Sequence, residues 1–349
     1  MKKIGIVTII GDYNYGNRLQ NYALYAVLKS LKYDVETINF KYMNCNVKNR
    51  IKILFRDVVV FLGLGRYKRN KKFRDFNKMI PFSKNIYNNT KIEVDKYEYF
   101  VCGSDQVWNY HFNEFGDNTL LKFSQKEKNI AYAASYGVSS IPKEYEEIYI
   151  TGLNNFKSIS LREQDGQVLT EKLIGKKCPV VLDPTLLLSR EEWDSLVKSK
   201  IIKRKYILVY VLGDKLKNIE RLFGNNFEII YMNDRNNKDI YSCGPNEFLG
   251  LIKNAEFIIT DSYHACIFSI IFEKKFAILD RMINNKKHME GRINTLLKMV
   301  ELNSLKINSI DEIVEKDLLN KNIDYDKCKK IINNEKDKSL KYLKDSLNR

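Results

Sequence analysis

The chain has 349 residues, more than one ordinary domain needs and suited to two domains of about 150 residues each. Apolar residues make up 44%, with only 16 Gly and 5 Pro, which excludes collagen-like, fibrous and wholly disordered proteins. The 59 Lys and Arg residues against 43 Asp and Glu residues give a formal charge of +16, which weakly favours anionic partners.

The first predicted elements form one β-α-β unit. The short, continuous apolar run at 4–10 is typical of a buried parallel strand, and it is too short, and lacks the cleavage site, for a signal peptide. A polar loop over 11–17 precedes apolar residues at helical spacing from Leu19 to Leu31, and 35–40 is a second strand. The connection between the strands should be right-handed.

Residues 41–95 are the least regular part of the sequence. Between Lys48 and Lys78 there are eleven Lys and Arg residues against two acidic ones. This composition predicts a helical insertion on the protein surface. The alternative is an amphipathic patch that binds an anionic membrane.

Four more short strands are predicted before residue 195, and polar or small residues follow each one. The strands are 97–102, 130–134, 158–161 and 180–182, followed by Gly103 to Gln106, Ser135 to Gly137, Arg162 with Glu163, and Asp183 to Thr185. We therefore expect an N-terminal domain over 1–195, with 41–95 as a basic helical insertion.

A second alternation of strands and helices begins at residue 206. It consists of strands 206–212, 227–231, 256–260 and 276–279 and helices 246–254, 265–272 and 293–300. This pattern predicts a C-terminal domain over 196–320. The remaining segment, 321–349, contains a polar helix that we expect to pack back on the N-terminal domain.

These two alternations predict an α/β protein with two Rossmann-like domains, whose parallel sheets face a cleft. Ligands bind such sheets beyond the carboxyl ends of the strands, where nearly all the polar segments fall. The six cysteines are scattered without a Cys-x-x-Cys pair, and there are three histidines, so no zinc pattern can be assembled. We expect no metal site, reduced thiols, a cytoplasmic protein and no transmembrane helix.

The loop after the first strand, from Gly11 to Arg18, leads directly into a helix, so its N–H groups could meet an anion or sugar hydroxyls. It lacks the Gly-x-Gly-x-x-Gly pattern and the phosphate-loop lysine, which argues against NAD binding and ATP hydrolysis. A plain loop with a helix cap is the alternative.

The segment 261–264 (Asp-Ser-Tyr-His) lies at a predicted strand-to-helix junction. Either of its first two residues can cap the helix, which places His264 in the first turn, where an imidazole suits general acid catalysis. The alternative is a structural polar residue near the surface. His111 and His288 have no comparable setting and are interpreted as surface residues.

Three arginines are candidates for binding a carboxylate or phosphate, because a guanidinium matches both groups. Arg162 follows a predicted strand, and Arg281 and Arg292 flank the last strand-to-helix connection. The alternative for each is an ordinary solvated side chain.

Five segments together resemble the polysaccharide pyruvyl transferase family over about residues 4–300. They are 14–17 (Asn-Tyr-Gly-Asn), 103–108 (Gly-Ser-Asp-Gln-Val-Trp), 160–163 (Ser-Leu-Arg-Glu), 182–185 (Leu-Asp-Pro-Thr) and 260–264 (Thr-Asp-Ser-Tyr-His). The resemblance implies a GT-B-like fold and transfer of pyruvate from phosphoenolpyruvate to sugar hydroxyls. The implied product is a pyruvate ketal on a bacterial surface polysaccharide, such as a capsule, or its lipid-linked precursor. Phosphoenolpyruvate is a co-substrate, and no cofactor or metal is implied.

The sequence departs from the family pattern at two positions. The family's donor site usually ends in Arg-Leu-His, whereas Ser262, Tyr263 and His264 stand here. Many members carry Asp where this chain has Asn17. Arg281 or Arg292 is the candidate to replace the missing arginine.

The resemblance also implies a division of roles. His264 is the expected acid that protonates the enol or assists phosphate departure, and Asp105 is the expected base or hydrogen-bond acceptor for sugar hydroxyls. Capping the next helix is the alternative role for Asp105. The expected donor-binding residues are Arg162, Ser262, Tyr263, Arg281 and Arg292. The expected acceptor-binding residues are Asn14, Tyr15, Gly16, Asn17 and Ser104.

Two other functions stay open. One is a GT-B glycosyltransferase that binds a nucleotide sugar near Gly213 and Asp261, and the other is a non-catalytic carbohydrate-binding relative. No nucleic-acid recognition motif stands out, so nucleic acid is not an expected partner. The basic segment Lys48–Lys78 fits an undecaprenyl-linked acceptor and a peripheral position on the inner membrane face.

Overall fold

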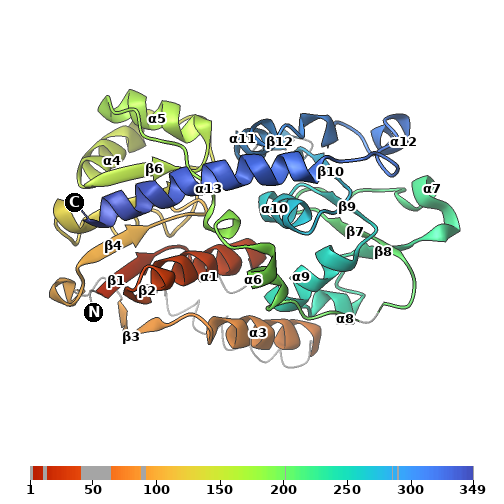
Figure 1. Cartoon of the computed structure of the whole chain (residues 1–349), viewed down its shortest axis with the longest axis horizontal. Coiled ribbons are helices and arrows are strands. Elements are labelled where there is room, and N and C mark those ends of the chain that lie inside the picture. The colour runs from red at the N-terminus through yellow and green to blue at the C-terminus, as the bar shows by residue number, and fades with distance from the viewer. Residues whose placement is uncertain are drawn as a thin grey trace. The chain divides into compact units, whose positions relative to one another are not determined.

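The structure is a computed structural model that describes residues 3–10, 14–40, 64–87, 92–200, 202–284, 286–288 and 291–348. Within these ranges the chain divides into two compact units (Figure 1). The first unit takes residues up to 40, 77–188 and 332–348. The second takes 64–76 and 189–331.

In the described ranges, the first unit contains a six-stranded parallel sheet in the order β3-β2-β1-β4-β5-β6. The strands are Lys3–Val7 (β1), Asp34–Phe40 (β2), Phe82–Tyr87 (β3), Tyr99–Cys102 (β4), Asn129–Ala134 (β5) and Ser158–Leu161 (β6). The helices are Tyr15–Ser30 (α1), Lys143–Asn154 (α4), Gln164–Ile174 (α5) and part of Tyr325–Asn348 (α13). Central β1 pairs Ile4 with Val35 and with Tyr99, and its buried residues explain the continuous apolar run of its sequence.

Two differences from the sequence-based expectations concern strands. The predicted strand 180–182 is wrong, because Val180 forms only an isolated bridge with Leu161 before Asp183 and Pro184 start a turn. Strand β3 was not expected within 41–95, although helix α3 (Leu64–Asn77) is the kind of element predicted there. The basic residues at 48–63 lie outside the described residues.

The second unit contains a five-stranded parallel sheet, again counted over the described residues, in the order β13-β10-β9-β7-β8. Its strands are Tyr206–Tyr210 (β7), Glu228–Tyr231 (β8), Phe257–Thr260 (β9), Phe276–Leu279 (β10) and Lys306–Ile307 (β13). A small antiparallel pair is formed by Arg281–Ile283 (β11) and Lys286–His288 (β12). The helices are Leu64–Asn77 (α3), Arg190–Asp194 (α6), Glu220–Phe223 (α7), Lys238–Tyr241 (α8), Pro245–Asn254 (α9), Tyr263–Ile271 (α10), Gly291–Met299 (α11) and Glu312–Glu315 (α12).

The C-terminal helix α13 supplies residues to both units. In the first unit its Ser339 Oγ accepts a hydrogen bond from the backbone N–H of Leu182 over 3.0 Å. Its Tyr342 hydroxyl donates to the carbonyl oxygen of Ala131 in β5 over 3.1 Å. The end of the chain therefore packs into the framework of the first sheet.

The core beneath the strand ends of the first unit is aromatic. Trp108 meets Tyr136 and Phe156 edge-on, with ring centroids 5.4 and 5.5 Å apart, and its indole N–H donates to the carbonyl oxygen of Thr119. These buried rings fix the loop that follows β4. Among the helices that the structure describes, none is both long and apolar enough to cross a membrane.

Candidate functional site

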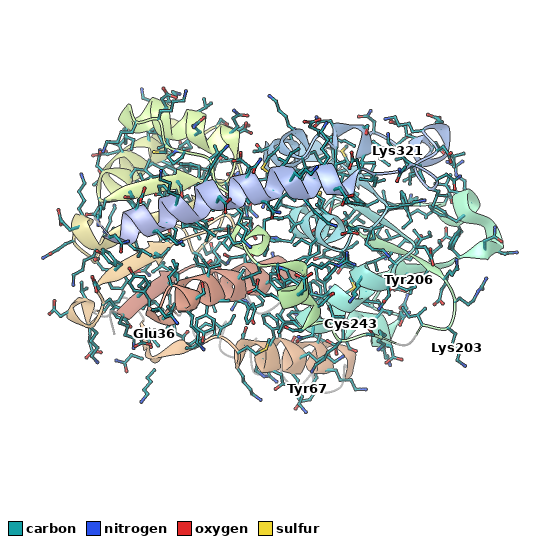
Figure 2. All side chains as sticks on the ribbon, in the orientation of Figure 1. Glu36, Tyr67, Lys203, Tyr206, Cys243 and Lys321 are labelled. Atoms are coloured by element: carbon teal, nitrogen blue, oxygen red, sulfur yellow. The ribbon has the colours of Figure 1, made fainter. Side chains whose placement is uncertain are left out.

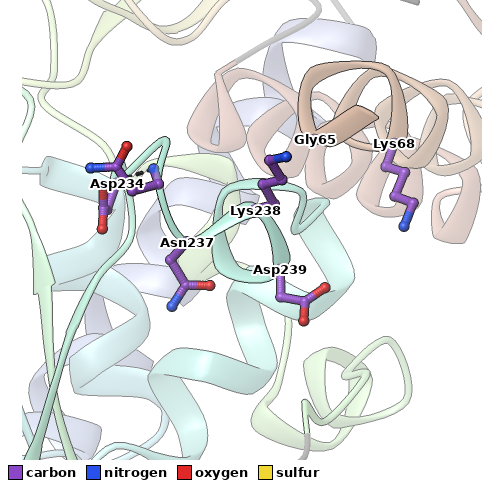
Figure 3. Close-up of a pocket in the computed structure, with 7 residues that line it drawn as sticks. Gly65, Lys68, Asp234, Asn237, Lys238 and Asp239 are labelled. Atoms are coloured by element: carbon purple, nitrogen blue, oxygen red, sulfur yellow. Dashed lines mark hydrogen bonds between the residues drawn. The ribbon is translucent and has the colours of Figure 1, made fainter. Parts of the chain in front are cut away.

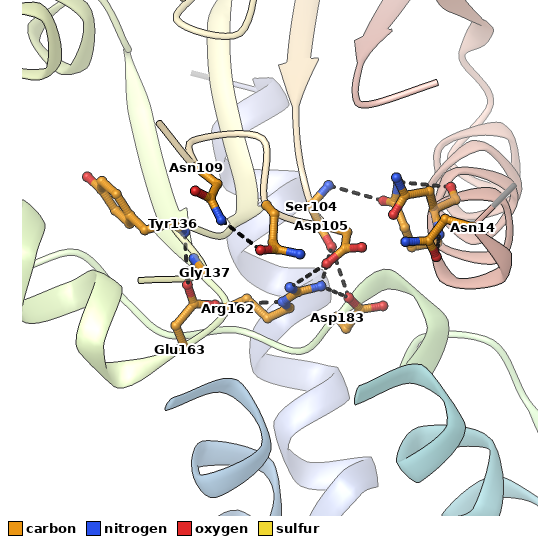
Figure 4. A network of polar contacts seen from close by, with 12 residues as sticks. Asn14, Ser104, Asp105, Asn109, Tyr136, Gly137, Arg162, Glu163 and Asp183 are labelled. Carbon is orange, nitrogen blue, oxygen red and sulfur yellow. Dashed lines mark hydrogen bonds and ion pairs between the residues drawn. The ribbon is translucent and has the colours of Figure 1, made fainter. Parts of the chain in front are cut away.

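A connected polar network lies at the carboxyl ends of the strands of the first unit, with Arg162 at its centre (Figure 4). Arg162 directly follows β6, and its side chain is fully buried. Nη2 donates to Oδ1 of Asp105 over 2.8 Å, and Nη1 donates to Oδ2 of Asp183 over 2.8 Å. Nε lies 3.7 Å from Oε2 of Glu163. One guanidinium thus contacts three carboxylates.

Asp183 is held from its other side by the turn that follows it. Its Oδ1 accepts from the backbone N–H of Thr185 over 3.0 Å and from the Thr185 hydroxyl over 2.7 Å. Pro184 stands at the first position of the 3₁₀-helix η3 (Pro184–Leu186), where a missing N–H costs nothing. Ser104 Oγ donates to Oδ2 over 2.9 Å, which links Asp183 to the loop after β4.

Ser104 also connects the network to α1. Its backbone N–H donates to Oε1 of Gln20 over 3.1 Å, and Nε2 of Gln20 donates to Oγ1 of Thr8 over 2.8 Å. Asp105 begins a run of turn residues over 105–108, so it does not cap a helix. The structure therefore brings the predicted residues Ser104, Asp105 and Arg162 together.

The first loop ends in a helix cap. Asn14 is the N-cap of α1, and its Oδ1 accepts from the backbone N–H of Asn17 over 3.3 Å. Tyr15, Gly16 and Asn17 are buried in the first turn, whereas Asn14 is exposed. Residues 11–13 of this loop lie outside the described residues. The acceptor-binding role of the loop stays a prediction.

In the second unit, the carboxylate of Asp261 organises the end of β9. It accepts from the backbone N–H groups of Leu212 and Gly213 over 2.7 and 2.8 Å, which ties the ends of β7 and β9 together. Arg281 contacts the same residue, with Nε 3.4 Å from Oδ2 and Nη2 donating to the carbonyl oxygen over 3.2 Å. Arg281 is therefore engaged by Asp261.

The N-terminal end of α10 carries the predicted histidine. Ser262 is the N-cap of α10, and its Oγ accepts a hydrogen bond from the backbone N–H of Ala265 over 3.5 Å. Of the two candidate caps, Asp261 and Ser262, the structure therefore has Ser262. His264 is the second residue of the helix and is 4% exposed. Its ring lies edge-on to the Tyr263 ring, with centroids 5.3 Å apart.

Arg292 joins this group from the first turn of α11. Its guanidinium carbon lies 5.8 Å from the centroid of the Tyr263 ring, within the range of a cation–π contact, and the residue is 6% exposed. An imidazole, a phenol ring and a guanidinium therefore gather at the first turns of α10 and α11, where helix N–H groups add partial positive charge.

Three members of the polar network around Arg162 were missed in the sequence analysis. Asp183 was noted in a motif but given no role, Glu163 was noted only beside Arg162, and Gln20 was not considered. Glu163 accepts through Oε1 from the backbone N–H groups of Tyr136 and Gly137 over 2.9 and 3.3 Å. The available signal was the position of Glu163 and Asp183 directly after strand-like segments.

An open cavity of about 660 Å³ lies in the second unit between α3 and the segment 234–239 (Figure 3). It is lined by Gly65, Lys68, Asp234, Asn236, Asn237, Lys238 and Asp239. The predicted site residues do not line it, so this cavity gives no support to the proposed chemistry. The described residues contain no cluster of three His, Cys, Asp or Glu side chains suited to a metal ion.

Comparison with solved structures shows the fold. UDP-GlcNAc 2-epimerase from Neisseria meningitidis, bound to UDP-GlcNAc, is 12% identical with a TM-score of 0.50, covering 98% of this chain and 99% of that one. The enzyme from Methanocaldococcus jannaschii, in complex with UDP-GlcNAc and UDP, is 13% identical with a TM-score of 0.50, covering 95% and 99%. At such low identity these structures support a GT-B-like α/β fold and nothing about substrates.

Comparison with curated proteins finds no significant match. Residues 14–281, more than half of the chain, match the model of the family described as Polysaccharide pyruvyl transferase. This match covers the end of the loop after β1, the residues around Arg162 and the segment that carries His264. The chain therefore belongs to the polysaccharide pyruvyl transferase family and is a transferase with a GT-B-like fold.

Proposed function

We propose that this transferase moves pyruvate from phosphoenolpyruvate onto two hydroxyls of one sugar and forms a cyclic ketal. The observation that carries the proposal is the grouping of His264, Tyr263 and Arg292 at the first turns of two helices in a chain of this family. A buried imidazole beside a guanidinium suits a donor that carries both a carboxylate and a phosphate.

The proposed reaction proceeds in two steps, an addition and then a substitution. In the first, His264 delivers a proton to C3 of the enol while a sugar hydroxyl oxygen bonds to C2 and its proton passes to a base, for which Asp105 is our candidate. In the second, another hydroxyl bonds to C2 and its proton passes to His264, the bond from C2 to the phosphate oxygen breaks, and inorganic phosphate leaves with the proton held by the base. The sum is phosphoenolpyruvate plus diol giving ketal plus phosphate, with no cofactor.

Arg292 is our candidate for the arginine that the family usually carries two residues before the histidine. The Arg292 guanidinium contacts the Tyr263 ring, and the Tyr263 ring in turn contacts the His264 ring. Arg281, the other candidate, contacts both the carboxylate and the carbonyl of Asp261, which favours a structural role. Ser262, as the cap of α10, keeps the remaining helix N–H groups oriented for donor binding.

We further propose that the acceptor is a surface-polysaccharide precursor on an undecaprenyl carrier, and that α3 helps the enzyme to meet the membrane. The exposed residues of the helix include Arg66, Lys68, Lys71 and Arg74, and Tyr67 among them is 44% exposed. Figure 2 labels Tyr67 on this helix. Such residues suit an anionic lipid surface. Neutralising these four residues should reduce co-sedimentation with anionic vesicles, and unchanged binding would contradict this part of the proposal.

The test of the reaction is phosphate release from phosphoenolpyruvate in the presence of candidate lipid-linked or nucleotide-linked sugars. His264→Asn should lower turnover by at least about 100-fold, as expected for loss of a general acid. His111→Asn is the matched control, because His111 is an exposed histidine in the first unit. Full activity of His264→Asn would refute the assigned acid. Consumption of a nucleotide sugar without phosphoenolpyruvate would replace the proposal by a glycosyltransferase.

A further inference from the structure

We propose that Arg162 is a positioning residue that, anchored by Asp183, fixes the carboxylate of Asp105 for the acceptor hydroxyls, and that it does not bind the donor's anion. This inference rests on the proposed function. It differs from the sequence-based prediction that Arg162 is a donor ligand, and it gives a role to Asp183, which had none.

The first argument is the set of contacts that the guanidinium already makes. One terminal nitrogen donates to Asp105 and the other to Asp183, each over 2.8 Å, and the second of these also lies 3.4 Å from the Ser104 hydroxyl. A phosphate or carboxylate ligand would have to compete with two carboxylates that are already in contact with the fork. Charge-assisted hydrogen bonds of this length are the strong ones.

The second argument is charge. Arg162 carries one positive charge, and the carboxylates of Asp105, Asp183 and Glu163 carry three negative charges when ionised. A dianionic donor would be repelled from that surrounding. The hydroxyls of a sugar are instead attracted to a carboxylate oxygen as hydrogen-bond donors.

The third argument is rigidity. The Asp183 side chain is fully buried and receives four hydrogen bonds, from Arg162, from Ser104 and twice from Thr185. The turn at Pro184 fixes the Asp183 carboxylate in place. Asp105, whose side chain is 5% exposed, then has one oxygen held by Arg162. Such support keeps a reacting carboxylate in one orientation, as positioning requires.

The experiment compares wild type with Arg162→Lys, Asp183→Asn, Asp105→Asn and the double variant Asp105→Asn/Asp183→Asn, all as the full chain. Phosphate release is measured as kcat and as KM for phosphoenolpyruvate. Asp183→Asn should lower kcat by about 100-fold, the scale of a misplaced reacting group, and leave KM for phosphoenolpyruvate within about threefold. In the Asp105→Asn background, Asp183→Asn should add less than about threefold.

Two kinetic results would overturn the inference. If Arg162→Lys raises KM for phosphoenolpyruvate by about tenfold or more at unchanged kcat, Arg162 binds the donor. If the effects of Asp105→Asn and Asp183→Asn multiply in the double variant, the two residues act independently.

A milder pair of variants guards against loss of the fold. Thr185→Val removes the hydroxyl that holds Asp183, and Thr185→Ser keeps it. Thr185→Val should lower kcat several-fold with unchanged KM for phosphoenolpyruvate, and Thr185→Ser should retain wild-type kcat. Wild-type kinetics of Thr185→Val would contradict the anchoring role.

If wild type releases no phosphate with any acceptor, the proposed function fails by itself. The positioning inference is then decided by a crystal structure of Asp183→Asn. A carboxylate of Asp105 that has moved away from Arg162 supports the inference. A carboxylate that stays at its 2.8 Å contact overturns it.

Discussion

Gly103 passes so close to Tyr132 that an added Cβ would lie 1.9 Å from the Tyr132 carbonyl oxygen. Gly103 also has a φ of +153°, which favours glycine. This contact brings the ends of β4 and β5 together and presents Ser104 and Asp105 to the Arg162 network. A side chain at position 103 would separate the two strand ends.

Gly103→Ala should therefore destabilise the first unit by more than about 4 kcal/mol or yield no soluble protein, because the clash is with backbone. Gly116→Ala is the matched control. It has a similar φ of +145° with no heavy atom within 4 Å, and the backbone strain alone should cost about 1–3 kcal/mol. Thermal unfolding of both variants measures the difference, and equal midpoints would show that the clash relaxes.

Arg292 and Arg281 should respond differently to removal of charge. Arg292→Met should raise KM for phosphoenolpyruvate by at least about tenfold, since a charge-assisted hydrogen bond to an anion contributes about 1.5–3 kcal/mol. Arg281→Met should mainly lower the thermal unfolding midpoint, because Arg281 holds Asp261. The reverse assignment of effects would make Arg281 the donor ligand.

The described cysteines should resist alkylation in the folded protein. Cys102, Cys178, Cys243, Cys266 and Cys328 are all buried free thiols. Burial raises the pKa of Cys243, which is labelled in Figure 2, to about 11. The reactive thiolate disappears as pH falls below the pKa, so at pH 8 only about 0.1% of Cys243 is thiolate. Burial also raises the pKa values of Cys102 and Cys266.

The measurement is the rate of N-ethylmaleimide labelling in a Cys45→Ser background, because Cys45 lies outside the described residues. Labelling at pH 8 should be at least about 100-fold slower than in urea, and it should quicken as pH rises toward 11. Equal rates in buffer and urea would contradict the buried thiols.

Glu273 should contribute acid-sensitive stability to the second unit. Partial burial raises the pKa of Glu273, but ion pairs with Lys329 and Arg190 at 2.7 and 2.8 Å outweigh it, and the net pKa is lowered. A carboxylate with a lowered pKa stabilises the fold above its ordinary value of 4.5, and this contribution is lost as pH falls below that value.

Glu273→Gln should therefore lower the free energy of unfolding by up to about 1 kcal/mol at pH 7, and by less at each pH step below 4.5. The exposed Glu127→Gln is the control variant. Denaturant unfolding at several pH values measures the difference in the free energy of unfolding between wild type and Glu273→Gln. A difference that does not change with pH would contradict the assignment.

The sequence predicted the strands well where burial on both faces produced continuous apolar runs, as at β1, β7 and β9. It placed the helix that carries His264, because Ser262 is a strong capping residue. It failed at 180–182, where one apolar triplet looks like a strand but pairs at a single position. Strand β3, with the polar sequence FSKNIY at a sheet edge, gave no comparable signal.

The sequence predicted Ser104, Asp105 and Arg162 as members of the candidate site, but it did not predict the contacts between them. Arg162 was expected to face a ligand, and instead it contacts carboxylates that lie 57 and 21 positions away in the sequence. Contacts of that separation depend on which strand ends become neighbours, and spacing along the chain does not reveal this. The same limit hid Gln20, which meets Ser104 from 84 positions away.

The hydrogen bond from Leu182 to Ser339 has a consequence for how the protein is made. The residue beside Asp183 is secured by a segment that the ribosome synthesises after the entire second unit. The first sheet can form early, but the turn at Asp183 stays unsecured until α13 has been made. A premature stop codon between positions 308 and 339 thus yields a chain with every described strand and an unfinished first unit.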